Sequence, residues 1–239
     1  MAQYVFHPAA TRGFADHGWL KSYQTFSFAG YYNPQRINFG ALRVLNDDIV
    51  SGGGGFGEHP HDNMEIISIP LEGELKHRDS MENAAVIKPG EIQVMSAGTG
   101  IYHTEFNNDK NKAVKFLQIW LYPNKRNVQP RYNQINIDNN IKNVLHQILS
   151  PDPMDEGVWI HQDAWFHKGD ITAGNTVDYQ IKKEGNGVYV FVISGSLIVD
   201  DHQLDTRDGL GVWDTRDITI KASTDAVVLL MDVPMEVDF

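Results

Sequence analysis

Two pairs of potential metal ligands carry the clearest chemical signal in the sequence. His59 and His61 are separated by one residue, and His103 and Glu105 repeat that spacing farther along the chain. Residues two apart on a β-strand point to the same face, so each pair can aim both side chains at one point. Two such pairs on facing strands would form a site of three imidazoles and one carboxylate.

This ligand set suits a single divalent transition metal. Nitrogen and oxygen ligands bind Fe²⁺, Mn²⁺, Ni²⁺, Co²⁺, Cu²⁺ or Zn²⁺, and the order of affinities alone does not choose among them. Four protein ligands on an octahedral ion leave two positions open, which is what binding of an organic ligand beside O₂ requires. The pattern therefore predicts an open metal site suited to catalysis.

The alternative is that these histidines are ordinary surface or core residues. A lone His-x-His on a strand is more often one of those than a metal site. Here a second pair of the same spacing follows a segment that contains Gly98 and Gly100, which favours metal binding. The chain has no cysteine, which excludes thiolate ligands, disulfides and a cysteine nucleophile.

The elements that must position these residues read as many short strands. Segments rich in Val, Ile, Phe, Tyr and Thr alternate with Gly, Pro, Asn and Asp. Convincing helical periodicity is absent, although residues 141–149 could form a short helix and residues 9–17 a turn of one. The sequence predicts an all-β protein.

A weak internal repeat divides the strands into two similar sets. Gly73 and Gly90 of the first set have counterparts in Gly195 and Gly209, at nearly constant offsets. We expect two antiparallel β-barrels joined near residues 123–134. The alternative is that the likeness reflects only what all β-hairpins share.

The expected domains are an N-terminal metal-binding barrel of residues 1–130 and a C-terminal barrel of residues 131–239 without metal ligands. The offsets of His59 and His61 from Gly73 fall on Ile181 and Lys183 in the second copy. No histidine follows His202. We therefore expect one metal per chain.

The charge and composition of the chain limit the classes of molecule that it is expected to bind. The chain of 239 residues has a formal net charge of −11 and a pI near 5.3 without a Lys/Arg cluster, which disfavours direct nucleic-acid binding. The opening lacks the features of an export signal, and no apolar run is long enough for a membrane span. We expect a cytoplasmic protein without membrane contact.

The ligand segments resemble the two cupin motifs. Gly53, His59, His61, Glu65 and Gly73 follow the spacing of motif 1, except that seven residues instead of six separate Glu65 from Gly73. Residues 89–103 resemble motif 2. In this comparison Glu105 takes the place of the fourth ligand of many cupins, which would be Glu65.

These departures are typical of the pirin family, which the chain resembles over nearly its full length. Residues 12–34, 59–61, 71–73 and 95–105 carry the resemblance, which is closest to bacterial pirin-like quercetin 2,3-dioxygenases. It implies a bicupin, with two double-stranded β-helix or jelly-roll barrels. It also implies a metal, usually iron, in the N-terminal barrel. The ligands that it implies are His59, His61, His103 and Glu105.

The resemblance also implies an activity. The metal would bind a flavonol such as quercetin through its deprotonated 3-hydroxyl, and the heterocycle would open with O₂ and release CO. Glu105 would either ligate the metal or take the hydroxyl proton as the catalytic residue. The alternatives are a non-catalytic metal-binding regulator that acts through protein partners, and a metal-free scaffold.

For several other residues, a structural role and a functional role both remain open. Glu65 is either an inward partner of the metal ligands or a structural residue. His77 and the remaining scattered histidines are expected to lack a paired carboxylate at metal spacing and to be solvated or hydrogen-bonded. Most aromatic residues near the ligands should be core, and some should line a substrate pocket. The aromatic residues to which both expectations apply are Phe26, Phe28, Tyr31, Phe56, Phe106 and Trp120.

Overall fold

The computed structural model describes residues 1–137 and 140–237. Within them the chain is almost entirely β, with four sheets and one short 3₁₀ helix at Ala9–Thr11. The all-β prediction is confirmed. Among the described residues no helix is long and apolar enough to cross a membrane.

The first barrel combines a seven-stranded and a four-stranded sheet. The larger sheet contains, in spatial order, β12 (Arg131–Asn136), β9 (Glu91–Ser96), β6 (Glu65–Glu72), β11 (Val114–Leu121), β4 (Leu42–Val50), β3 (Leu20–Gln24) and β2 (Gly13–Asp16). The smaller sheet contains β5 (Gly55–His61), β10 (Ile101–Asn107), β7 (Leu75–Asp79) and β8 (Ala84–Ile87).

The second barrel repeats this arrangement. Its larger sheet contains β1 (Gln3–His7), β20 (Gly209–Trp213), β17 (Asn186–Ser194), β22 (Ala226–Pro234), β15 (Trp165–Ile171), β13 (Leu145–Ser150) and β14 (Val158–Trp159). Its smaller sheet contains β16 (Thr176–Gln180), β21 (Asp217–Ala222), β18 (Leu197–Val199) and β19 (His202–Leu204). Neighbouring strands are antiparallel, except that β13 and β14 are parallel.

The two glycines of the sequence repeat occupy matching turns. Gly73 joins β6 to β7 with φ +76°, and Gly195 joins β17 to β18 with φ +84°. A Cβ atom on Gly73 would approach Val114 at the start of β11, and one on Gly195 would approach Ala226 at the start of β22. Glycine is therefore required twice for the same reason, because both the backbone angle and the space exclude a side chain.

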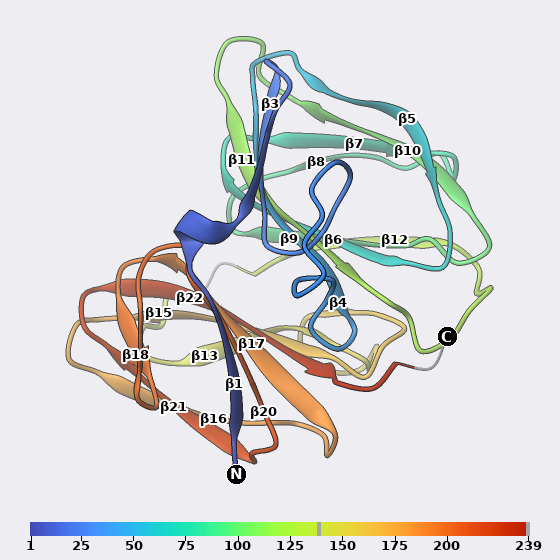
Figure 1. Ribbon diagram of the computed structural model, residues 1–239. Coiled ribbons are helices and arrows are strands. Elements are labelled where there is room, and N and C mark those ends of the chain that lie inside the picture. The colour runs from blue at the N-terminus through green and yellow to red at the C-terminus, as the bar shows by residue number, and fades with distance from the viewer. Residues whose placement is uncertain (138–139, 238–239) are drawn as a thin grey trace.

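The two halves exchange an edge strand. β1 begins the chain but pairs with β20 in the second barrel, whereas β12 pairs with β9 in the first (Figure 1). The boundary expected at residue 130 stays a prediction about folding units. In the sheets, each barrel contains a strand from the other side of that boundary.

The expected short helix over residues 141–149 is wrong. Residues from Leu145 onward form β13, which pairs with β15. Local sequence allowed a helix, but pairing with a neighbouring strand decided the conformation. Of the expected turn over residues 9–17, only Ala9–Thr11 is helical, and Gly13 already begins β2.

The larger sheets of the two barrels pack face to face through one apolar core. Leu117 and Ile119 of β11 belong to the same buried cluster as Tyr189, Phe191 and Leu229 of the second barrel. Burial of this area is the main stabilising contribution to the joining of the barrels. At its edge, Asp47 pairs with Arg12 at 3.3 Å and with Arg207 of the second half at 2.9 Å.

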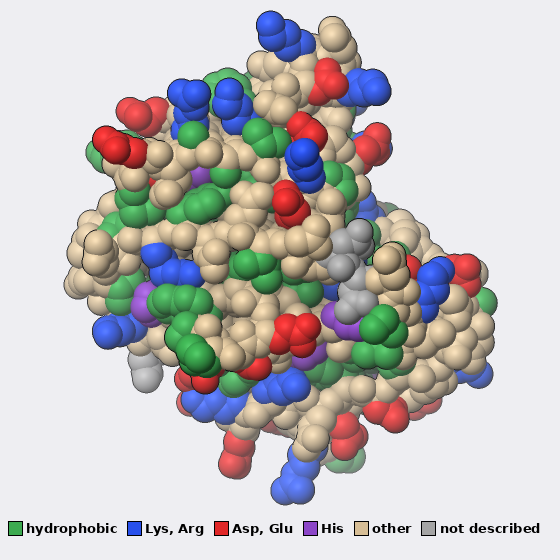
Figure 2. All heavy atoms as spheres, turned by 180° about the vertical axis from the view of Figure 1, so that it is seen from behind, with side chains coloured by type: hydrophobic (Ala, Val, Ile, Leu, Met, Phe, Trp, Pro, Cys, Tyr) green, Lys and Arg blue, Asp and Glu red, His purple; other side chains and the backbone are tan. Residues whose placement is uncertain are grey.

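The outer surface mixes charges of both signs. On the face shown in Figure 2, acidic and basic side chains are interspersed over both barrels. This distribution agrees with an acidic chain whose Lys and Arg residues are scattered.

Candidate metal centre

Strands β5 and β10 place the two predicted ligand pairs on the inner face of the smaller sheet. Along β10 the residues alternate between buried and more exposed, which turns His103 and Glu105 inward. His103 lies opposite His59, and Ile101 lies opposite His61. β5 is the edge strand of this sheet, which is where a proline such as Pro60 is tolerated.

The three imidazoles converge. Their ring centroids are 4.3 Å apart for His59 and His103, 4.9 Å for His59 and His61, and 4.9 Å for His61 and His103. One nitrogen from each ring lies within 4.8 Å of the others. This spacing leaves room for one ion between them.

The state of the nitrogens fits a metal. His103 is 1% exposed, and neither of its ring nitrogens has a hydrogen-bond partner. Leaving such a group unpaired costs about 1–3 kcal/mol, which a bound ion would remove. His59 Nδ1 lies 2.8 Å from the carbonyl oxygen of Gly57. That contact orients the ring and leaves Nε2 available as a ligand.

Burial keeps two of these rings neutral. It lowers the pKa of His61 to about 4, and the nearby His59 adds to the effect. The pKa of His103 is lowered to about 2, again first by burial and then by its histidine neighbours. Neutral imidazole is the form that binds metal, so protons compete weakly at neutral pH.

Glu105 lies deeper in the barrel than the histidines at the opening. It is 2% exposed, and its carboxylate accepts hydrogen bonds from Gln118 Nε2 at 2.9 Å and Ser68 Oγ at 3.3 Å. Burial raises its pKa. One of its oxygens groups within 4.8 Å with nitrogens of His77 and His103. His103 therefore joins Glu105 to the imidazole cluster.

His77 was not among the predicted ligands. It is fully buried on β7, directly opposite Glu105 on β10. Its Nε2 lies 3.1 Å from Asp79 Oδ2, and its Nδ1 has no partner. The expectation of a histidine without a paired carboxylate is wrong. The signal was present in the sequence, because His77 and Asp79 repeat the two-residue spacing of the other pairs.

A row of polar side chains faces the cluster from the opposite sheet. Gln93, Ser68, Gln118, Asn46 and Gln24 lie opposite one another across five neighbouring strands. All are buried, and several of their polar atoms have no partner. Burying polar groups is costly. Packing alone therefore does not explain these polar side chains in the barrel interior.

The second barrel lacks this chemistry at matching positions. Counted from Gly195 and the strand registers, the positions of His77, Glu105, His103 and His59 carry Val199, Ile220, Ile218 and Tyr179. The match for His59 is thus Tyr179 instead of Ile181, because the connection before the repeat glycine differs in length. These four residues belong to an apolar core.

Glu65 does not take part in the cluster. It begins β6 in the larger sheet and does not share a strand with His61. Its carboxylate accepts a hydrogen bond from Ser96 Oγ at 2.7 Å, and burial raises its pKa to about 7. Its neighbour Ile66 belongs to the core inside the first barrel. Glu65 therefore points to the other face, and its structural interpretation is correct.

Aromatic side chains lie beside the imidazoles. Trp120 packs edge-on against His61 at 4.9 Å, and Phe28 packs edge-on against Trp120 at 5.3 Å. Phe56 lies 6.2 Å from His59. Trp120 Nε1 is buried without a partner, so it can donate to a bound molecule. Phe106 alternates with the ligands of β10 and faces outward.

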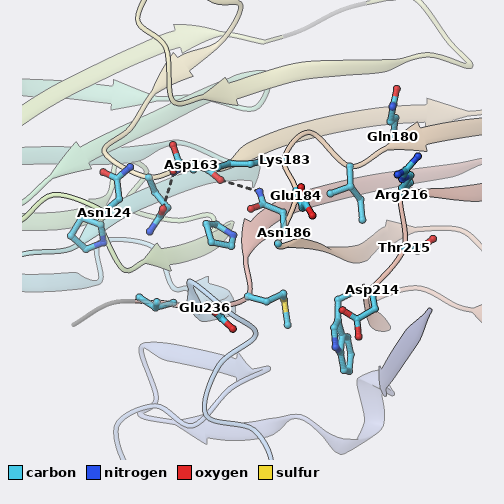
Figure 3. Close-up of a pocket in the computed structure, with 18 residues that line it drawn as sticks. Asn124, Asp163, Gln180, Lys183, Glu184, Asn186, Asp214, Thr215, Arg216 and Glu236 are labelled. Atoms are coloured by element: carbon cyan, nitrogen blue, oxygen red, sulfur yellow. Dashed lines mark hydrogen bonds and ion pairs between the residues drawn. The ribbon is translucent and has the colours of Figure 1, made fainter. Parts of the chain in front are cut away.

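A pocket of about 930 Å³ lies elsewhere, beside the second barrel. In Figure 3, Asp163 interacts with Lys183 and Asn186 along one side of it. Its lining also contains Glu184 and Arg216 but no residue of the imidazole cluster. The volume of this pocket is therefore no evidence that the metal centre lies in it.

Comparisons with known proteins agree with this architecture. The family description Pirin matches residues 6–121, and Quercetinase C-terminal cupin domain matches residues 147–233. A protein of Escherichia coli K12 named quercetin 2,3-dioxygenase is 42% identical over 226 residues, which cover 95% of this chain and 96% of the relative. A pirin-like protein of Caulobacter vibrioides is 37% identical over 92% of this chain and 95% of its own length.

A solved structure extends the likeness to three dimensions. The bacterial pirin YhhW of Escherichia coli in complex with nickel(II) superposes with a TM-score of 0.93 and 39% identity. The match covers 98% of this chain and 100% of that one. The prediction of two cupin barrels is confirmed. The chain belongs to the pirin family of bicupin proteins.

Proposed function

We propose that the protein is a metal-dependent dioxygenase that opens the heterocycle of a flavonol such as quercetin with O₂ and releases CO. The observation that carries this proposal is the convergence of the imidazoles of His59, His61 and His103, of which His103 is buried with both nitrogens unpartnered. The relative named quercetin 2,3-dioxygenase supports the class of substrate.

The proposed ligands are His59, His61, His103 and Glu105, with Fe²⁺ as the proposed ion. The nickel(II) complex of a related pirin supports a divalent metal. When bound, the ion would supply a Lewis acid for the flavonol hydroxyl and a path for electrons from the flavonol to O₂. Because the flavonol is the reductant and O₂ the oxidant, no other redox partner is required.

The protein's own groups would handle the proton and the ring system. Where Glu105 does not ligate the ion, its buried carboxylate would take the 3-hydroxyl proton as the base. Gln118 and Ser68 orient it through their hydrogen bonds. Trp120 and Phe28 would exclude water beside the half-exposed His61 and contact the flavonol rings.

An anaerobic titration tests this proposal. Protein loaded with Fe²⁺ without O₂ should shift the absorbance of quercetin to longer wavelength as the bound flavonol loses its proton. Admission of O₂ should then remove that absorbance. Metal binding without any flavonol response would support a non-catalytic regulator with protein partners. Failure to bind metal would support a scaffold. The exposed His17→Ala variant is the matched control and should behave as wild type.

A further inference from the structure

The outer face of the smaller sheet of the first barrel carries a second pocket. Its volume is about 330 Å³. It lies on the opposite side of β10 from the imidazole cluster. The residues that line it are Gly53, Lys76, Arg78, Thr104, Phe106, Asn107, Asn108 and Lys110.

The strand register builds this pocket. Thr104 lies opposite Arg78, and Phe106 lies opposite Lys76, on the paired strands β10 and β7. These residues alternate with the buried His103 and Glu105, so their side chains point outward. Each strand thus has one face in the metal centre and the other in this pocket.

Three cationic side chains line this pocket. Within residues 1–137 and 140–237, Lys76, Arg78 and Lys110 form no ion pair within 4.0 Å. The nearby Glu74 pairs instead with Lys88 and accepts a hydrogen bond from Asn108. Asp109 accepts hydrogen bonds from backbone amides, including that of Asn111.

This arrangement is unusual in a chain of net charge −11. Like charges gathered on one surface repel one another, and a bound anion removes that repulsion. An arginine beside two lysines is suited to a carboxylate, because its planar fork can hold both oxygens. The charges of the pocket therefore select an anion.

An apolar wall stands beside the cations. Phe106 is 37% exposed, and its ring lies across the backbone of Gly55, where a Cβ atom would collide with it. An exposed phenyl ring in a concave site can stack on a flat apolar group. The volume lies at the lower end of the range for small-molecule sites, about 300–1,000 Å³.

We propose that this pocket binds a small aromatic carboxylate, with the carboxylate on Arg78, Lys76 and Lys110 and the ring against Phe106. This site is distinct from the metal centre and does not depend on the proposed dioxygenase activity. It uses the opposite face of the same two strands.

Calorimetric titration with benzoate at physiological ionic strength tests the proposal on the full chain. Lys76→Gln with Arg78→Gln should weaken benzoate binding by about tenfold or more, since two charge-assisted contacts are lost. The matched control is Lys125→Gln with Arg126→Gln, which removes the same charge from exposed positions elsewhere. It should leave the affinity within about twofold of wild type, because distant exposed charges are largely screened.

Two further variants separate this pocket from other binding modes. His103→Ala should retain benzoate binding, whereas a carboxylate bound to the metal would be lost with the metal. Phe106→Leu should reduce the preference for benzoate over acetate and leave inorganic phosphate unaffected. The proposal is overturned if benzoate does not bind, if it binds equally to Lys76→Gln with Arg78→Gln, or if phosphate and acetate bind as tightly as benzoate.

Discussion

His103 on β10 lies directly opposite His59 on β5, with their ring centroids 4.3 Å apart. Burial and then the neighbouring histidines disfavour a proton on His103. Both nitrogens of His103 also lack a hydrogen-bond partner. A metal ion held between the two rings would satisfy these nitrogens better than protons would.

Removal of His103 should therefore abolish tight metal binding. Wild-type protein should hold about one ion per chain, since the matching positions of the second barrel are apolar. Loss of a residue that only supports a metal ligand typically lowers metal affinity by about 10–100-fold. His103→Ala removes a ligand itself, so its metal affinity should fall by at least that much. Elemental analysis after dialysis measures the difference.

The exposed His17→Ala variant is the control for this experiment and should retain the wild-type metal content. Two firmly held ions per chain in wild type, or full occupancy in His103→Ala, would show that the site lies elsewhere.

Asp79→Asn tests the second contact of the cluster. Asp79 holds His77 Nε2 at 3.1 Å, which leaves Nδ1, without a partner, as the nitrogen available to the group that His77 forms with His103 and Glu105. An amide can donate to Nε2 and so favour the other tautomer. Metal affinity, measured by competition with a chelator, should fall by about 10–100-fold. The exposed Asp201→Asn should have no effect. Equal affinity in the two variants would remove His77 from any role at the metal.

His7 should make the stability of the protein depend on pH. Its Nδ1 lies 2.9 Å from Tyr189 Oη, and burial, assisted by Arg36, lowers its pKa to about 4. Below pH 6.5, the ordinary pKa of histidine, His7 binds a proton in the unfolded chain but stays neutral in the folded protein. The free energy of unfolding should therefore fall between pH 6.5 and 4, by at most about 1.4 kcal/mol per pH unit from this group.

His7→Gln keeps a hydrogen-bonding group but does not titrate in this range. Urea unfolding of metal-free protein at several pH values should show a shallower decline for this variant than for wild type. Parallel declines would mean that His7 is protonated equally in both states.

The sequence predicted features that depend on local spacing. Alternation along a strand placed His59 beside His61 and His103 beside Glu105, and the repeat glycines marked two similar halves. The ligand spacing lies within a few residues and the repeat appears as a nearly constant offset along the chain, so neither required knowledge of the fold.

Pairing between distant strands was beyond the sequence. The two-residue spacing of His77 and Asp79 was visible in the sequence, but nothing local shows that β7 lies beside β10 and places His77 opposite Glu105. The exchange of β1 and β12 between the sheets was missed for the same reason. The orientation of Glu65 depended on a chain reversal between β5 and β6 that moves it to another sheet.

Glu105→Gln separates holding the metal from moving the proton. The amide keeps the size and can still bond to Ser68 and Gln118, but it loses the charge and basicity. Flavonol turnover should fall by about 10²–10⁴-fold, the usual contribution of a proton acceptor. Metal content should fall much less. Unchanged turnover would remove Glu105 from the proton step but leave the reaction itself intact.

The most direct test of the account is the amount of CO released per flavonol consumed. Wild-type protein is loaded in turn with Fe²⁺, Mn²⁺, Ni²⁺, Co²⁺ and Cu²⁺, and quercetin absorbance and CO are followed together in O₂. We predict equal amounts of CO formed and quercetin lost with at least one metal, and neither change in metal-depleted His103→Ala. Protein that holds each metal at His59, His61 and His103 yet never releases CO would contradict the dioxygenase assignment.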